Sequence, residues 1–265
     1  IIEDNRFVTA YSGFANRLRI KTSMSILKAT PSIAHAVVAI SSHLEERMKS
    51  LCKGKVPVTL IPITVNFRFF KREVREESGL TKIFYGGSFG AKDGLKYLIK
   101  GFEIVAKEHS NVVLILTGKG EVTNDFNEIM GLINASAYKH QIDYRGYLTT
   151  EEYYRVLNEC DIFCMTRNNS VYANAGFPFK LGEFLASGKT VIATNVGDVS
   201  MYLKDGFNAL LIQPESSEEI AGAINRILVN PLLGQQLGAE ARATADKYFN
   251  TEKLSPQLYD IFHNM

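Results

Sequence analysis

The stretch KIFYGGSFGAKDGLKYLIKGFEIVAKE, residues 82–108, contains a strand, a glycine-rich loop and a helix in immediate succession. Residues 82–85 are largely apolar without alternation, which predicts a strand that is covered on both faces. In the helix predicted over residues 95–108, Leu98, Phe102 and Val105 fall on one face. A strand, a loop and a helix in this order form one unit of a parallel α/β sheet.

The same alternation continues along most of the chain. Strands are predicted at residues 36–41, 58–61, 82–85, 112–117, 142–145, 161–165, 190–194 and 209–212. Helices are predicted at residues 95–108, 124–137, 150–159, 179–186, 217–230 and 231–248. Short loops between them indicate right-handed crossovers, so the segment from Lys82 to Ile212 predicts a complete doubly wound, Rossmann-like sheet.

The chain before residue 81 has a different organisation. It holds one strand–helix unit and one further strand, which are too few for a stable domain. Mixed charges at residues 71–77 follow an aromatic cluster and are typical of a connector. We therefore predict the tail of an N-terminal domain and the start of the connector at 1–66, a charged linker at 67–80 and a Rossmann-like domain at 81–265. The first residue is Ile1 rather than Met, which favours a piece of a longer protein.

Composition excludes several classes of protein. The 265 residues are 46% hydrophobic and 22% charged, as in an ordinary globular chain. The formal net charge is +2 without a long basic run, which argues against a nucleic-acid partner. No apolar run reaches the ~18–20 residues of a membrane span. Cys52, Cys160 and Cys164 are too few for a disulfide framework, which indicates a reducing compartment, and we expect buried thiols rather than a metal site.

Loops that follow strands are the candidate sites, because ligands bind at the carboxyl ends of strands in this fold. The loop GGSFGAKDG, residues 86–94, lets the backbone approach a ligand and precedes a helix N-terminus that suits a phosphate. Its spacing is neither GxGxxG nor a P-loop, so a tight turn is the alternative. The loop GKGE, residues 118–121, is a weaker signal, and a plain turn is the better interpretation in isolation.

The segment NAGFPFKLGEFLASGK, residues 174–189, is the third candidate. Pro178 suits the first position of a helix, which would leave the amides of Phe179 and Lys180 free. Lys180 and Glu183 are three residues apart and can share a helix face. Beside an anion site, Glu183 could accept hydrogen bonds from sugar hydroxyls. The alternatives are a favourable partner for the helix dipole and a solvated lysine.

Five segments in this order resemble the C-terminal half of the family 4 glycosyltransferases (glycosyl transferases group 1). They are IFYGG (83–87), LILTGKG (114–120), YRGY (144–147), FPFKLGEFLA (177–186) and GKTVIAT (188–194). The closing pattern DGFNALL (205–211) also matches, and residues 36–41 resemble the last strand of the family's N-terminal domain. The resemblance covers roughly residues 33–262.

The resemblance implies a GT-B fold, in which two Rossmann-like domains face a cleft. It implies transfer of a hexosyl group from a UDP- or GDP-sugar to a glycan or lipid-linked acceptor, with retained configuration and without a metal or another cofactor. The family's catalytic histidine is expected in the N-terminal region, most of which is absent here, so no catalytic residue is assigned and poor turnover by this chain alone is expected. A cytoplasmic location is implied, with peripheral association at the inner membrane face through the N-terminal domain as an option.

Residue by residue, the match is uneven. Glu183 corresponds to the second glutamate of the family's E-x7-E motif, which contacts the nucleotide ribose. The first glutamate, which binds the transferred sugar, is replaced by Ala175. Gly87 matches the glycine of the family's glycine loop, but the usual arginine and lysine of that loop are replaced by Ser88 and Asp93.

Two cations that would bind the diphosphate are therefore missing from their expected places. A departing diphosphate gathers charge and needs stabilisation. Without that arginine and without a DxD-type metal site, the remaining donors are the loop amides at 86–90, the helix N-terminus near Phe179 and a cation, either Lys180 or Lys92. We favour Lys180 because its helix should point into the crevice. The predicted diphosphate site comprises Gly86, Gly87, Ser88, Lys92, Phe179, Lys180 and Leu181.

The resemblance also indicates where the base and the sugar would bind. Residues predicted to contact the base are Lys119, Gly120, Gly146 and Tyr147, although Tyr147 could instead cover the sheet edge. Residues predicted to contact the sugar are Asn174, Ala175, Gly176 and Phe177.

Two other functions stay open at this point. A non-catalytic nucleotide-sugar-binding or partner subunit is favoured by Ser88, Asp93 and Ala175. A nicotinamide-dependent oxidoreductase is disfavoured, because the chain lacks GxGxxG and the acidic residue that usually follows it.

Overall fold

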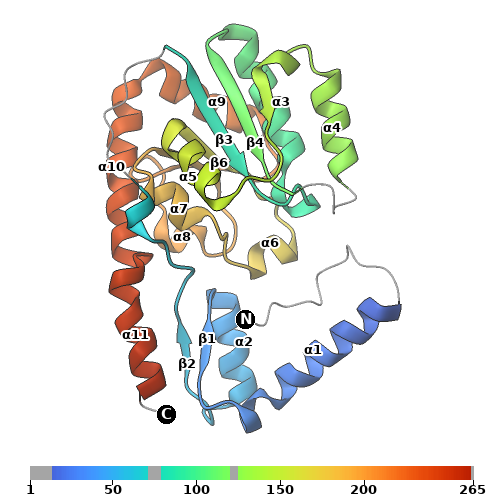
Figure 1. Cartoon of the computed structure of the whole chain (residues 1–265), viewed down its shortest axis with the longest axis vertical. Coiled ribbons are helices and arrows are strands. Elements are labelled where there is room, and N and C mark those ends of the chain that lie inside the picture. The colour runs from blue at the N-terminus through green and yellow to red at the C-terminus, as the bar shows by residue number, and fades with distance from the viewer. Residues whose placement is uncertain (1–13, 71–78, 120–124, 264–265) are drawn as a thin grey trace.

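The structure, a computed structural model, describes residues 14–70, 79–119 and 125–263. Its centre is a six-stranded sheet in the order β5-β4-β3-β6-β7-β8, with every neighbouring pair parallel (Figure 1). The six strands predicted between residues 82 and 212 are thus confirmed, with ends that shift by a residue. The strands are β3 (Thr81–Gly86), β4 (Val112–Thr117), β5 (Ile142–Tyr144), β6 (Ile162–Met165), β7 (Thr190–Thr194) and β8 (Leu210–Ile212).

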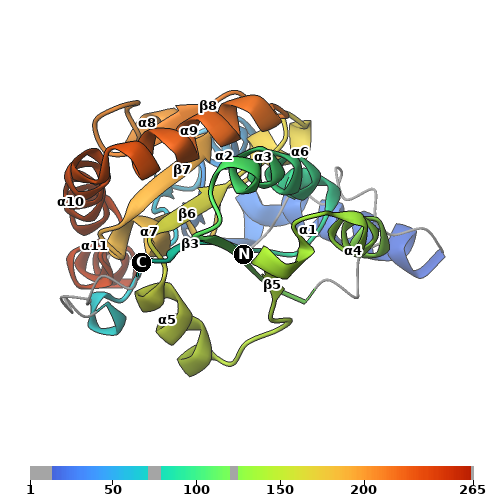
Figure 2. The same cartoon turned by 90° about the horizontal axis from the view of Figure 1, so that it is seen from above.

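Helices cover both faces of this sheet, which is why its strands are continuously apolar (Figure 2). Ile83 points to one face and packs in a cluster with Leu98 and Phe102, whereas its neighbour Phe84 packs on the other face with Phe184. The first face carries α3 (Leu95–Glu108), α4 (Phe126–Ala135) and α9 (Ser217–Val229). The second face carries α5 (Thr150–Glu159), α7 (Leu181–Ala186), α8 (Val199–Tyr202) and the end of α10 (Pro231–Tyr248).

A smaller unit lies beyond the carboxyl ends of β6 and β7 (Figure 1). It consists of α1 (Phe14–Ile33), β1 (Val37–Ala39), α2 (Ser42–Cys52) and β2 (Val58–Leu60), and its two strands pair in parallel. The sequence predicts both strands but no element over residues 14–33. Pro31 lies inside α1, and much of the helix is exposed, so its sequence carries no clear apolar face. None of the described helices is both long enough and apolar enough to cross a bilayer.

The part of the connector that the structure describes, which ends at Phe70, packs against the sheet domain. The Val65 N–H donates to the Phe249 carbonyl at 2.7 Å, and Phe70 is buried. Within the short helix η2 (Phe67–Phe69), the Phe69 ring stacks on Tyr154 with centroids 4.3 Å apart. The start of the predicted linker therefore packs on the surface of the sheet domain. Residues 71–78 lie outside the described part. The predicted domain boundaries at 66, 67 and 80 thus stay a prediction.

The last helix, α11 (Thr251–His263), continues beyond the sheet domain and runs beside the smaller unit in Figure 1. None of its residues is buried. It is therefore not part of either core.

The two units are joined by hydrogen bonds at the start of α2. The Asp198 carboxylate, in the loop after β7, accepts from the Ser42 backbone N–H at 2.7 Å and from the Ser42 hydroxyl. Next to it, the Ser41 hydroxyl donates to the Ala175 carbonyl at 3.0 Å and accepts from the Leu44 N–H, which caps α2. A carboxylate at a helix N-terminus is electrostatically favourable. These contacts fix the smaller unit over the carboxyl end of the sheet.

We expect Asp198→Ala to increase amide hydrogen exchange at the start of α2 by tenfold or more, because hydrogen bonds to a charged group contribute about 1.5–3 kcal/mol. Mass spectrometry of peptides that cover Ser42 would measure this. Asp205→Ala is the matched control, because Asp205 accepts from the Leu211 N–H within the sheet domain. Equal exchange near Ser42 in both variants and the wild type would show that Asp198 does not hold the units together.

Candidate functional site

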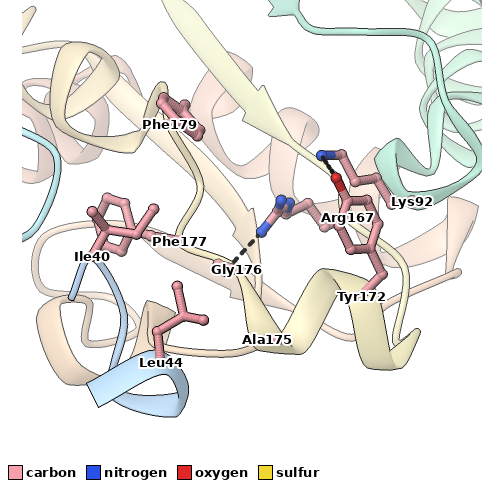
Figure 3. A pocket seen from close by; sticks show the side chains of 9 residues that line it. All are labelled: Ile40, Leu44, Lys92, Arg167, Tyr172, Ala175, Gly176, Phe177 and Phe179. Atoms are coloured by element: carbon pink, nitrogen blue, oxygen red, sulfur yellow. Dashed lines mark hydrogen bonds between the residues drawn. The ribbon is translucent and has the colours of Figure 1, made fainter. Parts of the chain in front are cut away.

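A narrow pocket lies where the two units meet, at the carboxyl end of the sheet (Figure 3). Its cavity volume is about 40 Å³. The smaller unit contributes Ile40 and Leu44, and the sheet domain contributes the rest of the lining. These residues are Lys92, Arg167, Tyr172, Ala175, Gly176, Phe177 and Phe179. The pocket thus contains two cations on a background of apolar and aromatic side chains.

The glycine loop after β3 lies tightly against the end of β4. The Gly87 N–H donates to the Thr117 carbonyl at 3.0 Å. Gly118 has a φ of +149°, and a Cβ there would lie 1.8 Å from the Gly87 carbonyl oxygen. Only glycine fits at position 118, because the two backbones touch.

Ser88 and Asp93 close the glycine loop on itself. The Ser88 hydroxyl and the Gly90 N–H donate to the same Asp93 oxygen, at 2.7 and 3.1 Å. The expectation that amides of residues 86–90 face an anion is therefore wrong for Gly87 and Gly90, whose N–H groups already have partners. The loop provides a rigid edge of the site, and Lys92 is the cation that it contributes.

Lys92 and Arg167 are held side by side by bonds between two loops. Lys92 belongs to the short helix η3 (Ala91–Asp93), and Arg167 follows the end of β6 by two residues. The Thr166 hydroxyl donates to the Asp93 carbonyl at 3.1 Å, and the Asn168 N–H donates to the Lys92 carbonyl at 2.9 Å. These bonds are made by the residues next to each cation in the chain. They therefore fix the two loops, and with them the positions from which Lys92 and Arg167 extend.

Arg167 is the functional candidate that the sequence analysis missed. It is only 8% exposed, and its Nη1 donates to the carbonyls of Ala173 and Gly176, each at 3.1 Å (Figure 3). Desolvation lowers its pKa, and the nearby Asp93 carboxylate opposes this effect. A signal existed, because an arginine directly after a central strand stands at the ligand-binding edge of the sheet.

Lys180 and Glu183 are not among the residues that line the pocket with this pair of cations. The helix α7 begins at Leu181 rather than at Phe179, because the Leu181 N–H closes a turn onto the Pro178 carbonyl at 3.0 Å. The expectation that Pro178 is the first helical residue is therefore wrong. Lys180 is not among the residues that line the pocket, and its Nζ lies 4.0 Å above the Tyr153 ring.

The Glu183 carboxylate is held by two tyrosines of α5. It accepts from the Tyr153 hydroxyl at 2.8 Å and from the Tyr154 hydroxyl at 2.9 Å. Burial and this carboxylate raise the pKa of both phenols, so they stay protonated donors. Burial also lowers the pKa of Lys180, and Glu183 counteracts that effect. A carboxylate has about four lone-pair positions, so Glu183 can accept further hydrogen bonds.

The predicted sugar-binding residues divide into two groups. Ala175, Gly176 and Phe177 line the pocket. Asn174, in the short helix α6 (Val171–Ala175), uses its amide within the protein. Its oxygen accepts from the Gly197 N–H at 2.9 Å, and its nitrogen donates to the side chain of Asn169 and to the Ser170 carbonyl. Asn174 therefore shapes the loop beside the pocket.

The predicted base-binding loops lie next to each other. The Gly118 N–H donates to the Gly146 carbonyl at 2.9 Å, which joins the ends of β4 and β5. Lys119 is exposed, and Tyr147 is 76% exposed. Gly120 lies outside the described residues. An exposed aromatic ring beside two strand ends provides a surface on which a base can stack.

Within the described ranges, no group of three or more histidine, cysteine, aspartate and glutamate side chains could hold a metal ion. The three cysteines are free and buried, and burial raises the pKa of Cys160 and Cys164 to about 12. The prediction of buried thiols is thus confirmed, and thiols with such pKa values are unreactive.

Comparisons with known proteins agree with this architecture. A family model described as glycosyl transferases group 1 matches residues 66–244. An uncharacterized glycosyltransferase of Methanocaldococcus jannaschii is 20% identical over 245 residues, which cover 91% of this chain and 60% of that protein. The chain thus spans about three fifths of this relative.

Two solved structures show the same fold. The sucrose-phosphate synthase from Thermosynechococcus elongatus matches with a TM-score of 0.75 at 20% identity, over 92% of this chain and 61% of that one. The Anabaena protein HepE in complex with UDP-glucose matches with a TM-score of 0.75 at 17% identity, over 92% and 68%. The predicted α/β fold of the GT-B type is thereby confirmed.

Proposed function

Because the chain belongs to the glycosyl transferases group 1 family, we propose that it forms the donor-binding part of a hexosyltransferase. The donor is a UDP- or GDP-sugar, and the acceptor is a glycan or a lipid-linked glycan. The bond between the anomeric carbon and the diphosphate breaks, a bond to the acceptor oxygen forms on the same face, and the proton of the acceptor hydroxyl passes to the departing diphosphate. No metal is required in this proposal.

The observation that carries this proposal is the position of Lys180 and Glu183 at the start of α7, at the carboxyl edge of the sheet. The ribose hydroxyls would donate to Glu183, whose carboxylate is already oriented by two tyrosines. The diphosphate would lie beside Lys180, and its partly desolvated ammonium gains most from an anion. The base would reach Lys119, Gly146 and Tyr147, and the resemblance adds Gly120, which lies outside the described residues.

The test is binding of nucleotides to the chain, measured by calorimetry and by thermal shift with UDP, GDP, their sugars and NAD. A ligand at a hundred times its Kd stabilises the folded state by about 2.7 kcal/mol. We expect UDP or GDP to bind and NAD not to bind. Failure of both UDP and GDP to bind would overturn the proposal.

Lys180→Ala is expected to weaken UDP or GDP binding at least tenfold, about 1.4 kcal/mol. Lys92→Ala should weaken it less, because Lys92 contacts Tyr172 in the pocket, whose lining does not include Glu183. Lys189→Ala is the control, because Lys189 precedes β7 at the opposite edge of the sheet. Equal affinities for the Lys180 and Lys189 variants would remove Lys180 from the diphosphate site.

A non-catalytic sugar-nucleotide-binding subunit is the second candidate. The Ser88–Asp93 bond closes the glycine loop, and Ala175 leaves the sugar subsite without a carboxylate. Sugar transfer by the protein, abolished by Glu183→Ala, would exclude this candidate.

A further inference from the structure

We propose that the pocket around Arg167 and Lys92 is the subsite for an acidic transferred sugar, so that the donor is a nucleotide-diphosphate hexuronate. This inference rests on the proposed function and specifies its substrate class. It assigns the two cations to the carboxylate of the sugar rather than to the diphosphate.

The charge of the pocket supports an acidic sugar. Ala175 lines it, at the position where the resemblance implies a glutamate that binds the transferred sugar. None of the nine lining residues is acidic, and two are cations. A neutral sugar offers hydroxyl donors, which suit a carboxylate. Here the expected carboxylate is missing, and Arg167 and Lys92 line the same pocket. The charge of the pocket is therefore positive rather than negative, which suits an anion.

Arg167 is built into the pocket as a fixed donor. Its Nη1 is held by two backbone carbonyls, and among the described residues no hydrogen-bond acceptor is recorded for its Nη2 or Nε. A planar guanidinium binds a carboxylate through two parallel N–H···O bonds. Its burial makes the side chain rigid, and a buried charge gains from a paired anion.

Lys92 and the pocket walls complete the subsite. The Lys92 Nζ lies 3.5 Å from the Tyr172 hydroxyl and 4.5 Å from the centre of its ring, so it points into the same pocket (Figure 3). Ile40 and Leu44 close the other side, which lowers the local dielectric and strengthens charge pairing. A cavity of about 40 Å³ exceeds the roughly 10–15 Å³ that one water needs and has room for a carboxylate group.

The neighbouring acid leaves the pocket with a net positive charge. The Asp93 carboxylate interacts with Arg167, but it accepts from Ser88 and Gly90, is absent from the pocket lining and can offset at most one of the two cations. Lys180 and Glu183 are absent from it as well, whereas Phe179, the neighbour of Lys180 in the chain, lines it. The pocket therefore adjoins the proposed diphosphate site.

The experiment is calorimetry on the full chain with UDP, UDP-glucose and UDP-glucuronate, and with the GDP series if GDP is the preferred nucleotide. We expect the wild type to bind the uronate donor at least tenfold more tightly than the neutral donor. Arg167→Gln should lose at least ten times more affinity for the uronate donor than for the free nucleotide. Arg167→Lys, which keeps the charge without the planar fork, should lose less, and circular dichroism confirms folding.

The outcomes separate this inference from the proposed function. Equal wild-type affinity for the uronate and neutral donors would overturn the inference while leaving the proposed function intact. An equal loss of affinity for all three ligands in Arg167→Gln would assign the arginine to the diphosphate and overturn the inference as well. If Arg167→Gln fails to fold, Lys92→Gln takes its place with the same comparison. No binding of any nucleotide would overturn both.

Discussion

Replacement of Gly94 by alanine is expected to lower the free energy of unfolding by about 3 kcal/mol. Gly94 joins η3 to α3 with a φ of +62°, and a Cβ there would lie 1.9 Å from the Thr166 carbonyl oxygen. The left-handed conformation costs alanine about 1–2 kcal/mol. Displacement of the Thr166 backbone adds about 1–3 kcal/mol. Urea unfolding measures the sum, and Tm should fall by about 2–4 °C per kcal/mol.

Gly206 provides the matched control for this prediction. Its φ is +70°, and a Cβ there would meet nothing within 4 Å. Gly206→Ala therefore reports the cost of the backbone conformation alone, and the difference between the two variants reports the close approach to Thr166. Equal losses would show that the two loops are not pressed together. Gly94→Ala should also weaken ligand binding, because a shift of Thr166 separates Arg167 from Lys92.

The strands of the sheet could be predicted because a strand that is buried on both faces has a continuous apolar sequence. In β7 all five residues are buried, and the sequence predicts this strand with the correct ends. The start of α7 could not be predicted, since Pro178 suits either a first helical residue or a turn. The turn is chosen by packing, in which Phe177 and Leu181 are both buried in one cluster.

The site was only partly predictable, because its contacts join segments that are distant in the chain. Thr166 bonds to a carbonyl 73 positions earlier, and this contact places Arg167 beside Lys92. No local pattern around residue 167 contains that information. The resemblance to the E-x7-E motif singles out the glutamate of α7, but its partners Tyr153 and Tyr154 come from another helix. Motifs thus predict which loops and helix could form the site, whereas tertiary contacts determine which charged side chains lie together in it.

Glu183→Ala is expected to weaken UDP or GDP binding by about a hundredfold, about 2.7 kcal/mol, and to lower the free energy of unfolding by about 3 kcal/mol. Two hydroxyl bonds to a carboxylate are lost, each worth about 1.5–3 kcal/mol before allowance for its partial exposure. Lys180 also loses the carboxylate that offsets its burial. Calorimetry at a temperature where the variant is folded measures the first effect, and urea unfolding measures the second.

The tyrosines allow the two roles of this carboxylate to be separated. In the double variant Tyr153→Phe/Tyr154→Phe, both hydroxyls are lost, whereas the ring beneath Lys180 and the carboxyl group of Glu183 are both still present. This variant should lose about 2 kcal/mol of stability, because two donors are removed, yet bind the nucleotide within about threefold of the wild type. If the double variant instead loses as much affinity as Glu183→Ala, then Glu183 only holds α5 in position, and another residue contacts the ribose. If only Glu183→Ala loses affinity, the carboxylate itself meets the ligand, because the supporting hydrogen bonds are absent in both variants.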